Sequence, residues 1–489
     1  MRAAALLVLM LNLCGLAHAD SLLEAARRGD EAAALAMLDA GAPAAAAAAD
    51  GATALHWAAH HGNVRLATRL IRGGAPVQRA NEFGVTPLLA AAAAGHASML
   101  KLLLDAGADV ESANADGQTA LMLVARSSNV AAAKLLLDRG AQVDARERWR
   151  GQTALLWAAA QSQPGMVALL LERGADPDAR SAINPNARQI TAEPRAMYRP
   201  AGGLTPLLYA ARQGCEACAR HLLEAGAGID LEDPEGTTPL LVALANLHFD
   251  LAAMLVASGA SPNKWDWRGI SPLYLAIDMN TLPHGGRPDR PSLDRMTGLD
   301  VAKALLAAGA NPDLRLKLHP GYREVKDDRG SDRILGIGAT PLLRAAKGFD
   351  LPAIELLLAH GARVDLATAN GITPLMAAAG LGSRIGDTRG DYESPDVEQR
   401  SLRAVQRLLD AGADVHRKAK DGRTAAFGPA TWGWPAVLAL LFSRGARADV
   451  ADNKGQSLLA AAKMHEATRQ LITSKLGEGA PGEVAAASP

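Results

Sequence analysis

The sequence predicts an all-α solenoid of helix-turn-helix units over residues 20–476. The first observation is a Thr or Ser that repeatedly opens an apolar run, with seven of the ten spacings equal to 33 or 34. The second is a composition that is 49% apolar but only 3% aromatic, which favours closely packed Ala- and Leu-rich helices. Units of this length bury their apolar surface against neighbouring units and form no single globular core. The residues that open the units are Thr53, Thr86, Thr119, Thr153, Thr205, Thr238, Ser271, Thr340, Thr373, Thr424 and Ser457.

Each part of the unit has a physical reason. The hydroxyl of a Thr such as Thr86 can cap the first turn of a helix, and a following Pro fits that turn. A Gly such as Gly107 suits the left-handed residue that ends a second helix. Segments such as "DPEG" at Asp233 are tight-turn sequences between units. The unit is therefore predicted to be a helix, a turn, a second helix and an extended finger.

This unit resembles the ankyrin repeat. The T-P-L-H-x-A signature of that family is partly met by "TALHWA" from Thr53 and "TPLLAA" from Thr86. The likeness extends from Asp20 to Leu476 and covers about twelve units. The resemblance implies β-hairpin-like fingers and a protein partner that is bound by the finger tips and by the exposed end of each first helix.

The two ends of the chain are predicted to lie outside the solenoid. "MRAAALLVLMLNLCGLAHAD" has a positive charge at Arg2, an apolar run and Ala17-His18-Ala19, which predicts a signal peptide over residues 1–19. A membrane anchor is the weaker interpretation because the run is too short to span a bilayer. The protein is expected to be periplasmic or secreted, and its Ala- and Arg-rich composition suggests a bacterial type. Residues 477–489 are predicted to be disordered.

Charge and motifs exclude several functions. Lys plus Arg equals Asp plus Glu at 51 each, which argues against a nucleic-acid or anionic-membrane partner. The sequence has no G-x-S-x-G, Walker, H-E-x-x-H or EF-hand pattern, so no enzyme activity, cofactor or metal site is predicted. His60 and His61 are neighbours on a predicted helix and point apart, which indicates solvated side chains. No membrane span is predicted beyond the leader.

Cys215 and Cys218 form a Cys-x-x-Cys pair at the predicted start of a second helix. Structural thiols or a local disulfide are the favoured interpretation, because a redox site of the thioredoxin type needs a βαβ setting and a zinc site needs more ligands. Residues three apart on a helix lie close enough for a disulfide, which would close a very short loop.

Irregular spacings reveal four insertions, near residues 179–203, 280–297, 314–338 and 380–401. The first and third lengthen fingers, and the second and fourth lengthen turns between the two helices of a unit. We expect them to form walls around the first helices of the units that open at Thr205, Ser271, Thr340 and Thr373, creating a pocket. Tolerated surface insertion is the alternative.

Partner contacts are expected at finger tips and at the ends of first helices, where the resemblance places them. Trp and Arg are enriched in binding hot spots, and a chain with so few aromatic residues has several Trp residues at these places. Trp57 and Trp157 are expected to be packed instead. The candidate contact residues are Trp149, Arg150, Arg212, Gln213, Trp265, Trp267, Arg268, Asp278, Met279, Trp432 and Trp434.

The sequence thus favours a non-catalytic protein-binding scaffold in the cell envelope. One alternative is a small-ligand receptor that uses the same pocket. Another is a thiol oxidoreductase at Cys215 and Cys218. The identity of the partner and the oligomeric state are not predicted.

Overall fold

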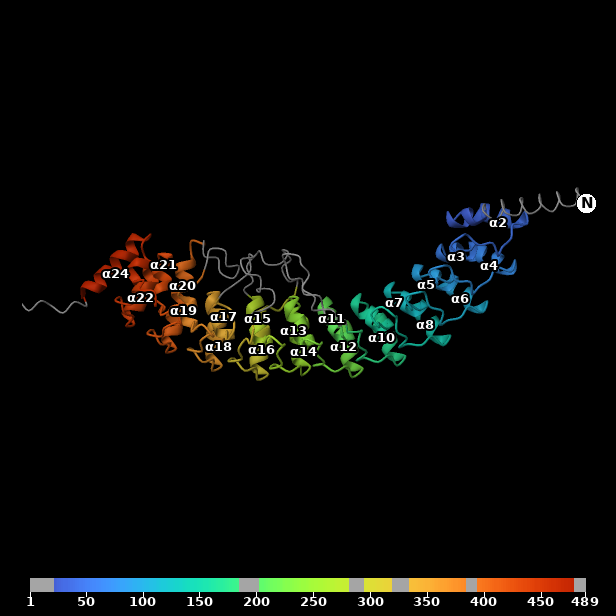
Figure 1. Ribbon diagram of the computed structural model, residues 1–489. Helices are drawn as coiled ribbons and strands as arrows, with labels where there is room; N and C mark the ends of the chain where they lie inside the picture. Colours follow the sequence, from blue (N-terminus) through green and yellow to red (C-terminus); the bar gives the residue numbers. More distant parts are fainter. Residues whose placement is uncertain (1–21, 184–201, 281–293, 319–333, 384–393, 479–489) are drawn as a thin grey trace, which may run out of the picture. The chain divides into compact units, whose positions relative to one another are not determined.

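The computed structural model describes residues 22–183, 202–280, 294–318, 334–383 and 394–478 (Figure 1). These residues divide into two compact units: unit 1 contains the described residues up to Pro234, and unit 2 contains those from Glu235 onward. The predicted signal peptide, the central parts of the four predicted insertions and nearly all of the predicted tail lie outside the described residues.

Unit 1 is a stack of antiparallel helix pairs in which each first helix packs against the first helices of its neighbours (Figure 1). A helical segment over residues 22–27 precedes α2. The helices are α2 (Glu31–Asp39), α3 (Ala54–His60), α4 (Val64–Arg72), α5 (Pro87–Ala94), α6 (Ala97–Asp105), α7 (Ala120–Arg126), α8 (Val130–Asp138), α9 (Ala154–Ala160), α10 (Pro164–Glu172), α11 (Pro206–Gln213) and α12 (Glu216–Glu224).

Unit 2 continues the same construction, with α13, α15, α17 and α19 as successive first helices that pack on one another. Its helices are α13 (Pro239–Ala245), α14 (Phe249–Ala257), α15 (Pro272–Asn280), α16 (Gly298–Ala307), α17 (Pro341–Lys347), α18 (Leu351–Ala359), α19 (Pro374–Ala378), α20 (Val397–Asp410), α21 (Phe427–Trp432), α22 (Pro435–Ser443), α23 (Leu458–Ala461) and α24 (Glu466–Glu478).

The helices begin and end where the repeated residues predict. Thr86 lies in extended backbone before α5, and its hydroxyl accepts a hydrogen bond from the Leu89 N–H at 3.3 Å. Gly107 follows α6 with φ of +88°, a conformation that costs glycine little. Ala91 and Ala92 of α5 are fully buried, as are Leu100 and Leu103 of α6. The Ala and Leu pattern therefore forms the continuous core.

The fingers are joined tip to tip by backbone hydrogen bonds. In unit 1 the Ala115 N–H donates to the Phe83 carbonyl at 3.0 Å, and the Arg148 N–H donates to the Asp116 carbonyl at 2.8 Å. The equivalent bond in unit 2 runs from the Lys317 N–H to the Arg268 carbonyl at 2.7 Å. Within the fingers that the structure describes, isolated β-bridges such as Ala113 with Thr119 are present and no longer strands form. These bonds fix neighbouring tips in register.

Two helices overlap segments that were predicted to lie outside the regular repeat. α20 begins at Val397, within the insertion predicted near residues 380–401, and is 14 residues long. Val397 and Ser401 are buried, so this helix continues where one face packs on its neighbour. α24 extends to Glu478, within the predicted tail.

Candidate partner-binding surfaces

The finger before α9 presents an exposed tryptophan. Trp149 is 80% exposed at the tip, beside the exposed Arg150. The tip is closed by the buried carboxylate of Glu147, which accepts hydrogen bonds from the N–H groups of Trp149 at 2.6 Å, Arg150 at 2.7 Å and Gln152 at 3.0 Å. Glu147 itself is only 4% exposed. Its hydrogen bonds fix the backbone of the tip, and this fixed backbone holds the Trp149 side chain in water.

Glu147 also explains why this unit is one residue longer than its predecessor. In the preceding finger Asn114 closes the tip by accepting from the Gln118 N–H at 2.9 Å. Both tips are closed by a matching backbone bond, from the Asn114 N–H to the Gln118 carbonyl and from the Glu147 N–H to the Gln152 carbonyl, each 3.1 Å. The extra methylene of Glu spans the extra residue. The spacing of 34 between Thr119 and Thr153 therefore marks a modified tip.

A groove of about 450 Å³ lies beside this tip. Arg126 stacks over the Trp157 ring at 4.6 Å, and the indole N–H of Trp157 has no hydrogen-bond partner among the described residues. Gln152 is buried and donates from its amide to the Tyr209 hydroxyl at 2.8 Å. The groove is lined by Asp116, Gln118, Glu147, Trp149, Arg150, Gln152 and Trp157.

A second groove, of about 590 Å³, lies among the fingers of unit 2. Trp265 is 42% exposed at its edge, and the Lys317 ammonium lies 3.1 Å from the centre of the Trp265 ring. Trp267 is 37% exposed on the same finger, whereas Arg268 is buried against the Trp267 ring at 4.7 Å. The expectation that Arg268 offers its side chain to a partner is therefore corrected, because it packs behind Trp267.

The first helices of unit 2 contain a buried ion pair, and one of its members, Asp278, was predicted to have another role. Asp278 on α15 was expected to contact a partner, but it is fully buried and pairs with Arg344 on α17. Arg344 donates through Nε to the Asp278 carboxylate and through Nη2 to the Asp278 carbonyl at 3.2 Å. The assignment is wrong because a neighbouring first helix supplies the opposite charge. Met279, the next residue, is half-buried.

Further buried polar groups lie next to this pair. Lys347, one turn after Arg344 on α17, is fully buried and donates to the Ser383 hydroxyl at 2.5 Å. Asn280 at the end of α15 donates to the Asp350 carboxylate at 2.9 Å. Buried charges need partners of this kind to offset the loss of water. The polar groups between α15 and α17 are therefore packed against one another.

The prediction that Trp434 contacts a partner is also corrected. It is 5% exposed and stacks on Trp432, with ring centres 5.8 Å apart. The indole N–H of Trp432, which is half-buried, donates to the Gly380 carbonyl at 3.0 Å. Trp434 also meets the Phe349 ring edge to face. The pair packs because Gly380 has no side chain: an added Cβ would lie 2.7 Å from the Trp434 ring.

Other predicted contact residues are exposed. Arg212 and Gln213 lie at the end of α11, where Arg212 stacks over Tyr209 at 4.9 Å. Trp57 and Trp157 are half-buried on first helices. The contact roles of the exposed residues stay predictions.

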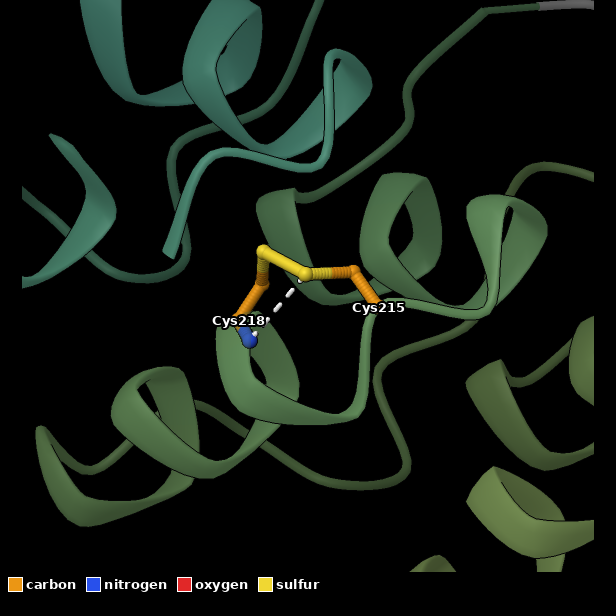
Figure 2. The surroundings of a disulfide bond; sticks show 2 residues. All are labelled: Cys215 and Cys218. Carbon is orange, nitrogen blue, oxygen red and sulfur yellow. Dashed lines mark hydrogen bonds between the residues drawn. A yellow bond between two sulfur atoms is a disulfide. The ribbon is translucent and has the colours of Figure 1, made fainter. Parts of the chain in front are cut away.

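Cys215 and Cys218 form a disulfide at the start of α12 (Figure 2). Cys215 is the residue before the helix, and its sulfur accepts a hydrogen bond from the Cys218 N–H at 3.2 Å. Cys218 is fully buried between helices, while Cys215 is half-buried. The bond joins two positions of one helical turn, with Cα atoms 5.3 Å apart.

Among the described histidines, His56 is the one whose pKa is clearly shifted. Its Nδ1 accepts from the Thr53 N–H at 3.0 Å, so the proton is on Nε2, which donates to the Val85 carbonyl at 3.0 Å. Burial lowers the pKa of His56, because the charged ring would lose its water. His60 and His61 are both exposed on the surface. Within the described ranges, no group of three or more His, Cys, Asp and Glu side chains could hold a metal ion.

Five residues of these surfaces were not predicted from the sequence: Glu147, Arg315, Lys317, Arg344 and Lys347. Arg344 follows Thr340 by four residues, at a place that is uncharged in every other unit, as at Ala90 and Leu123. That departure was a usable signal. Lys317 gave no such signal, because its approach to Trp265 depends on how two fingers pack.

Comparison with known proteins agrees with this geometry. The family profile "Ankyrin repeats (3 copies)" matches residues 22–114, 110–181, 187–266 and 207–283, which is more than half of the chain. The chain belongs to the ankyrin-repeat family. Ankyrin-type helix pairs continue beyond residue 283 to α24, past the matched region. None of the described helices has both the length and the apolar character that a membrane-spanning helix requires.

Two similar proteins align with about half of this chain or less. The human "Ankyrin repeat and SOCS box protein 16" is 31% identical over 253 residues, which is 52% of this chain and 46% of that protein. The mouse "B-cell lymphoma 3 protein homolog" is 30% identical over 195 residues, 37% of this chain and 42% of that protein. The alignments thus span under half of these relatives. Ankyrin repeats generally mediate protein–protein interaction.

Proposed function

We propose that the chain is an exported, bacterial-type ankyrin scaffold of about twelve repeats that binds a protein in the cell envelope without catalysing a reaction. The observation that supports it most is Trp149, an aromatic side chain 80% exposed on a tip fixed by three hydrogen bonds to Glu147. A rigid exposed Trp loses little entropy on binding, and Trp is frequent in hot spots.

Two features support export. The leader has the organisation of a signal peptide, and the Cys215–Cys218 disulfide suits an oxidising compartment. Sequencing the amino terminus of protein recovered from the periplasm tests this point. A mature chain that starts at Asp20 is the expected result, and an intact leader on cytoplasmic protein would contradict it.

In each unit the proposed contacts combine finger tips with the ends of first helices. Trp149 and Trp267 are both followed by Arg-Gly at equivalent places in two fingers. Arg212 and Gln213 add exposed polar groups on α11. The insertions are proposed to add walls to this surface, and limited proteolysis with a binding assay tests their contribution.

The direct test is affinity capture and cross-linking from an envelope extract. The intact protein is compared with a variant in which Trp149 and Trp267 are both changed to Ala. Met464→Ala is the control, because the Met464 side chain is 79% exposed, almost the same as Trp149. A partner retained by the intact chain and the control but lost by the double variant supports the proposal. Equal recovery with all three proteins would contradict it.

A small ligand is the second candidate function. The two grooves, of about 450 and 590 Å³, fall within the size range of small-molecule sites. A ligand that raises the melting temperature of the purified chain without a protein partner would favour this alternative.

A further inference from the structure

The groove in unit 2 has a distinct charge. Its lining includes Arg315 and Lys317 but no Asp or Glu. Neither cation forms an ion pair with a carboxylate that the structure describes, and both are exposed. Two carboxylates that are close in sequence to the lining residues have other partners: Asp313 binds Arg363 at 2.9 Å, and Asp266 accepts from N–H groups of its own tip. The groove therefore has a positive charge that the described residues do not offset.

The same groove has an apolar side. Trp265 is 42% exposed, and Ile337 across the groove is 45% exposed. Leu318, next to Lys317, is 38% exposed. Apolar side chains of this size at adjoining places favour a ligand that also presents apolar groups.

Backbone hydrogen bonds hold the two sides together. The Leu316 N–H donates to the Ala339 carbonyl at 3.0 Å, and the Gly338 N–H donates to the Leu316 carbonyl at 2.7 Å. Leu316, which forms both bonds, is buried, whereas Arg315 and Lys317 on either side of it are exposed. Two exposed cations that line one groove suit a ligand with more than one carboxylate.

We propose that this groove binds an extended acidic segment of the partner protein, with carboxylates on Arg315 and Lys317 and an apolar side chain between Trp265 and Ile337. This inference rests on the proposed protein-binding function and specifies the chemistry of one contact. The ammonium of Lys317 is held over the Trp265 ring, so it is positioned before the ligand arrives.

The test uses the full chain and a short labelled peptide in which Leu alternates with Glu, measured by fluorescence anisotropy. The comparison ligands are the same peptide with Lys in place of Glu, and a labelled single-stranded oligonucleotide. We expect the Glu peptide to bind best and to weaken as salt is added. Equal binding of the Lys peptide, or tighter binding of the oligonucleotide, overturns the proposal.

Variants locate the site. Changing Arg315 and Lys317 to Glu should weaken binding of the Glu peptide by about tenfold or more, because each removes a charge-assisted contact and adds repulsion. The matched control is Arg417→Glu with Lys418→Glu, two exposed cations of another finger, which should bind normally. Similar losses in both variants would mean that net charge alone is sensed and would overturn the groove assignment.

The two proposals fail differently. If the Trp149 and Trp267 variant loses its captured partner while the Glu peptide never binds, the groove inference is wrong and the scaffold function stands. If the Glu peptide binds with the predicted charge dependence but capture is unaffected by loss of both Trp side chains, the proposed finger-tip function is wrong.

Discussion

Arg344 and Asp278 form an ion pair between α17 and α15 with both side chains fully buried. The guanidinium also donates to the Asp278 carbonyl, while its Nη1 has no hydrogen-bond partner among the described residues. A buried pair of this kind is costly to break because the remaining charge stays buried without its partner.

Changing Asp278 to Ala should therefore destabilise unit 2 by about 3–5 kcal/mol. Replacing both partners by apolar residues, Asp278→Leu with Arg344→Met, should restore much of that loss. Hydrogen exchange at α15 and α17 measures the effect locally, which matters because a solenoid need not unfold in one step. Asp449→Ala, which breaks an exposed pair with Arg447, is the control and should leave exchange unchanged. A single variant as stable as the native chain would contradict this account.

Glu147→Ala should loosen the tip that presents Trp149. The change leaves three backbone N–H groups without their acceptor, at a cost of about 1–3 kcal/mol. Faster amide exchange at Trp149, Arg150 and Gln152 is expected, together with weaker partner capture. Arg148→Ala, an exposed side chain on the same tip, is the control. Unchanged exchange in the Glu147 variant would show that the tip does not depend on this carboxylate.

Unit 1 should lose stability in mild acid through His56. Its folded pKa is lowered by burial below the unfolded value of about 6.5, so the unfolded chain binds more protons once the pH falls below that value. The stability contributed by the neutral ring is present above about pH 6.5 and declines as the pH decreases toward the folded pKa. Melting curves against pH measure it. The dependence should shrink in His56→Gln and persist in His61→Asn; equal profiles in both would contradict the assignment.

Reduction of Cys215–Cys218 should have a small effect on stability. The four-residue loop gives a disulfide contribution of about 2 kcal/mol in the chain-entropy model, less than a long loop would give. Mass spectrometry should find the exported protein lighter than its reduced form by two hydrogen atoms. A disulfide-reduction assay distinguishes the oxidoreductase alternative: activity in the native chain that disappears in Cys215→Ala with Cys218→Ala would support catalysis against the scaffold.

Gly380→Ala should disturb the aromatic packing in unit 2. Gly380 has φ of +79°, and a Cβ there would lie 2.7 Å from Trp434 and 3.0 Å from Trp432. Gly412→Ala is a matched control, because its φ is +89° but its Cβ would meet nothing within 4 Å. Both variants strain the backbone by about 1–2 kcal/mol. We expect a larger loss of melting temperature and a changed tryptophan emission for Gly380 alone.

Much of the fold follows from local rules that one sequence contains. Thr86 caps α5 and Gly107 ends the following helix, and both roles depend on residues within a few places along the chain. The exposure of Trp149 was predictable for the same reason, since a tip is a local structure. The burial of Asp278 was not predictable, because its partner Arg344 lies 66 residues away and is brought close only by helix stacking.

The grooves also depend on contacts between residues that are far apart in the sequence. Trp265 and Lys317 lie on different fingers, and their contact depends on the register between those fingers. Trp434 was expected at a surface because it lies at a predicted turn, yet the absence of a side chain at Gly380 gives it a place to pack. Residue type alone therefore indicates which side chains can bind, and neighbouring repeats decide which remain accessible.

The tip-to-tip hydrogen bonds continue on both sides of the third insertion. Lys317 donates to Arg268 before the insertion, and the Ile337 carbonyl accepts from Ala369 after it, with Leu316 and Gly338 bonded between them. The residues of these bonds lie on both sides of residues 319–333, which makes that segment a place to test loop grafting. Foreign loops of different length could be exchanged there, which would make this finger a platform for engineered recognition without redesign of the repeats.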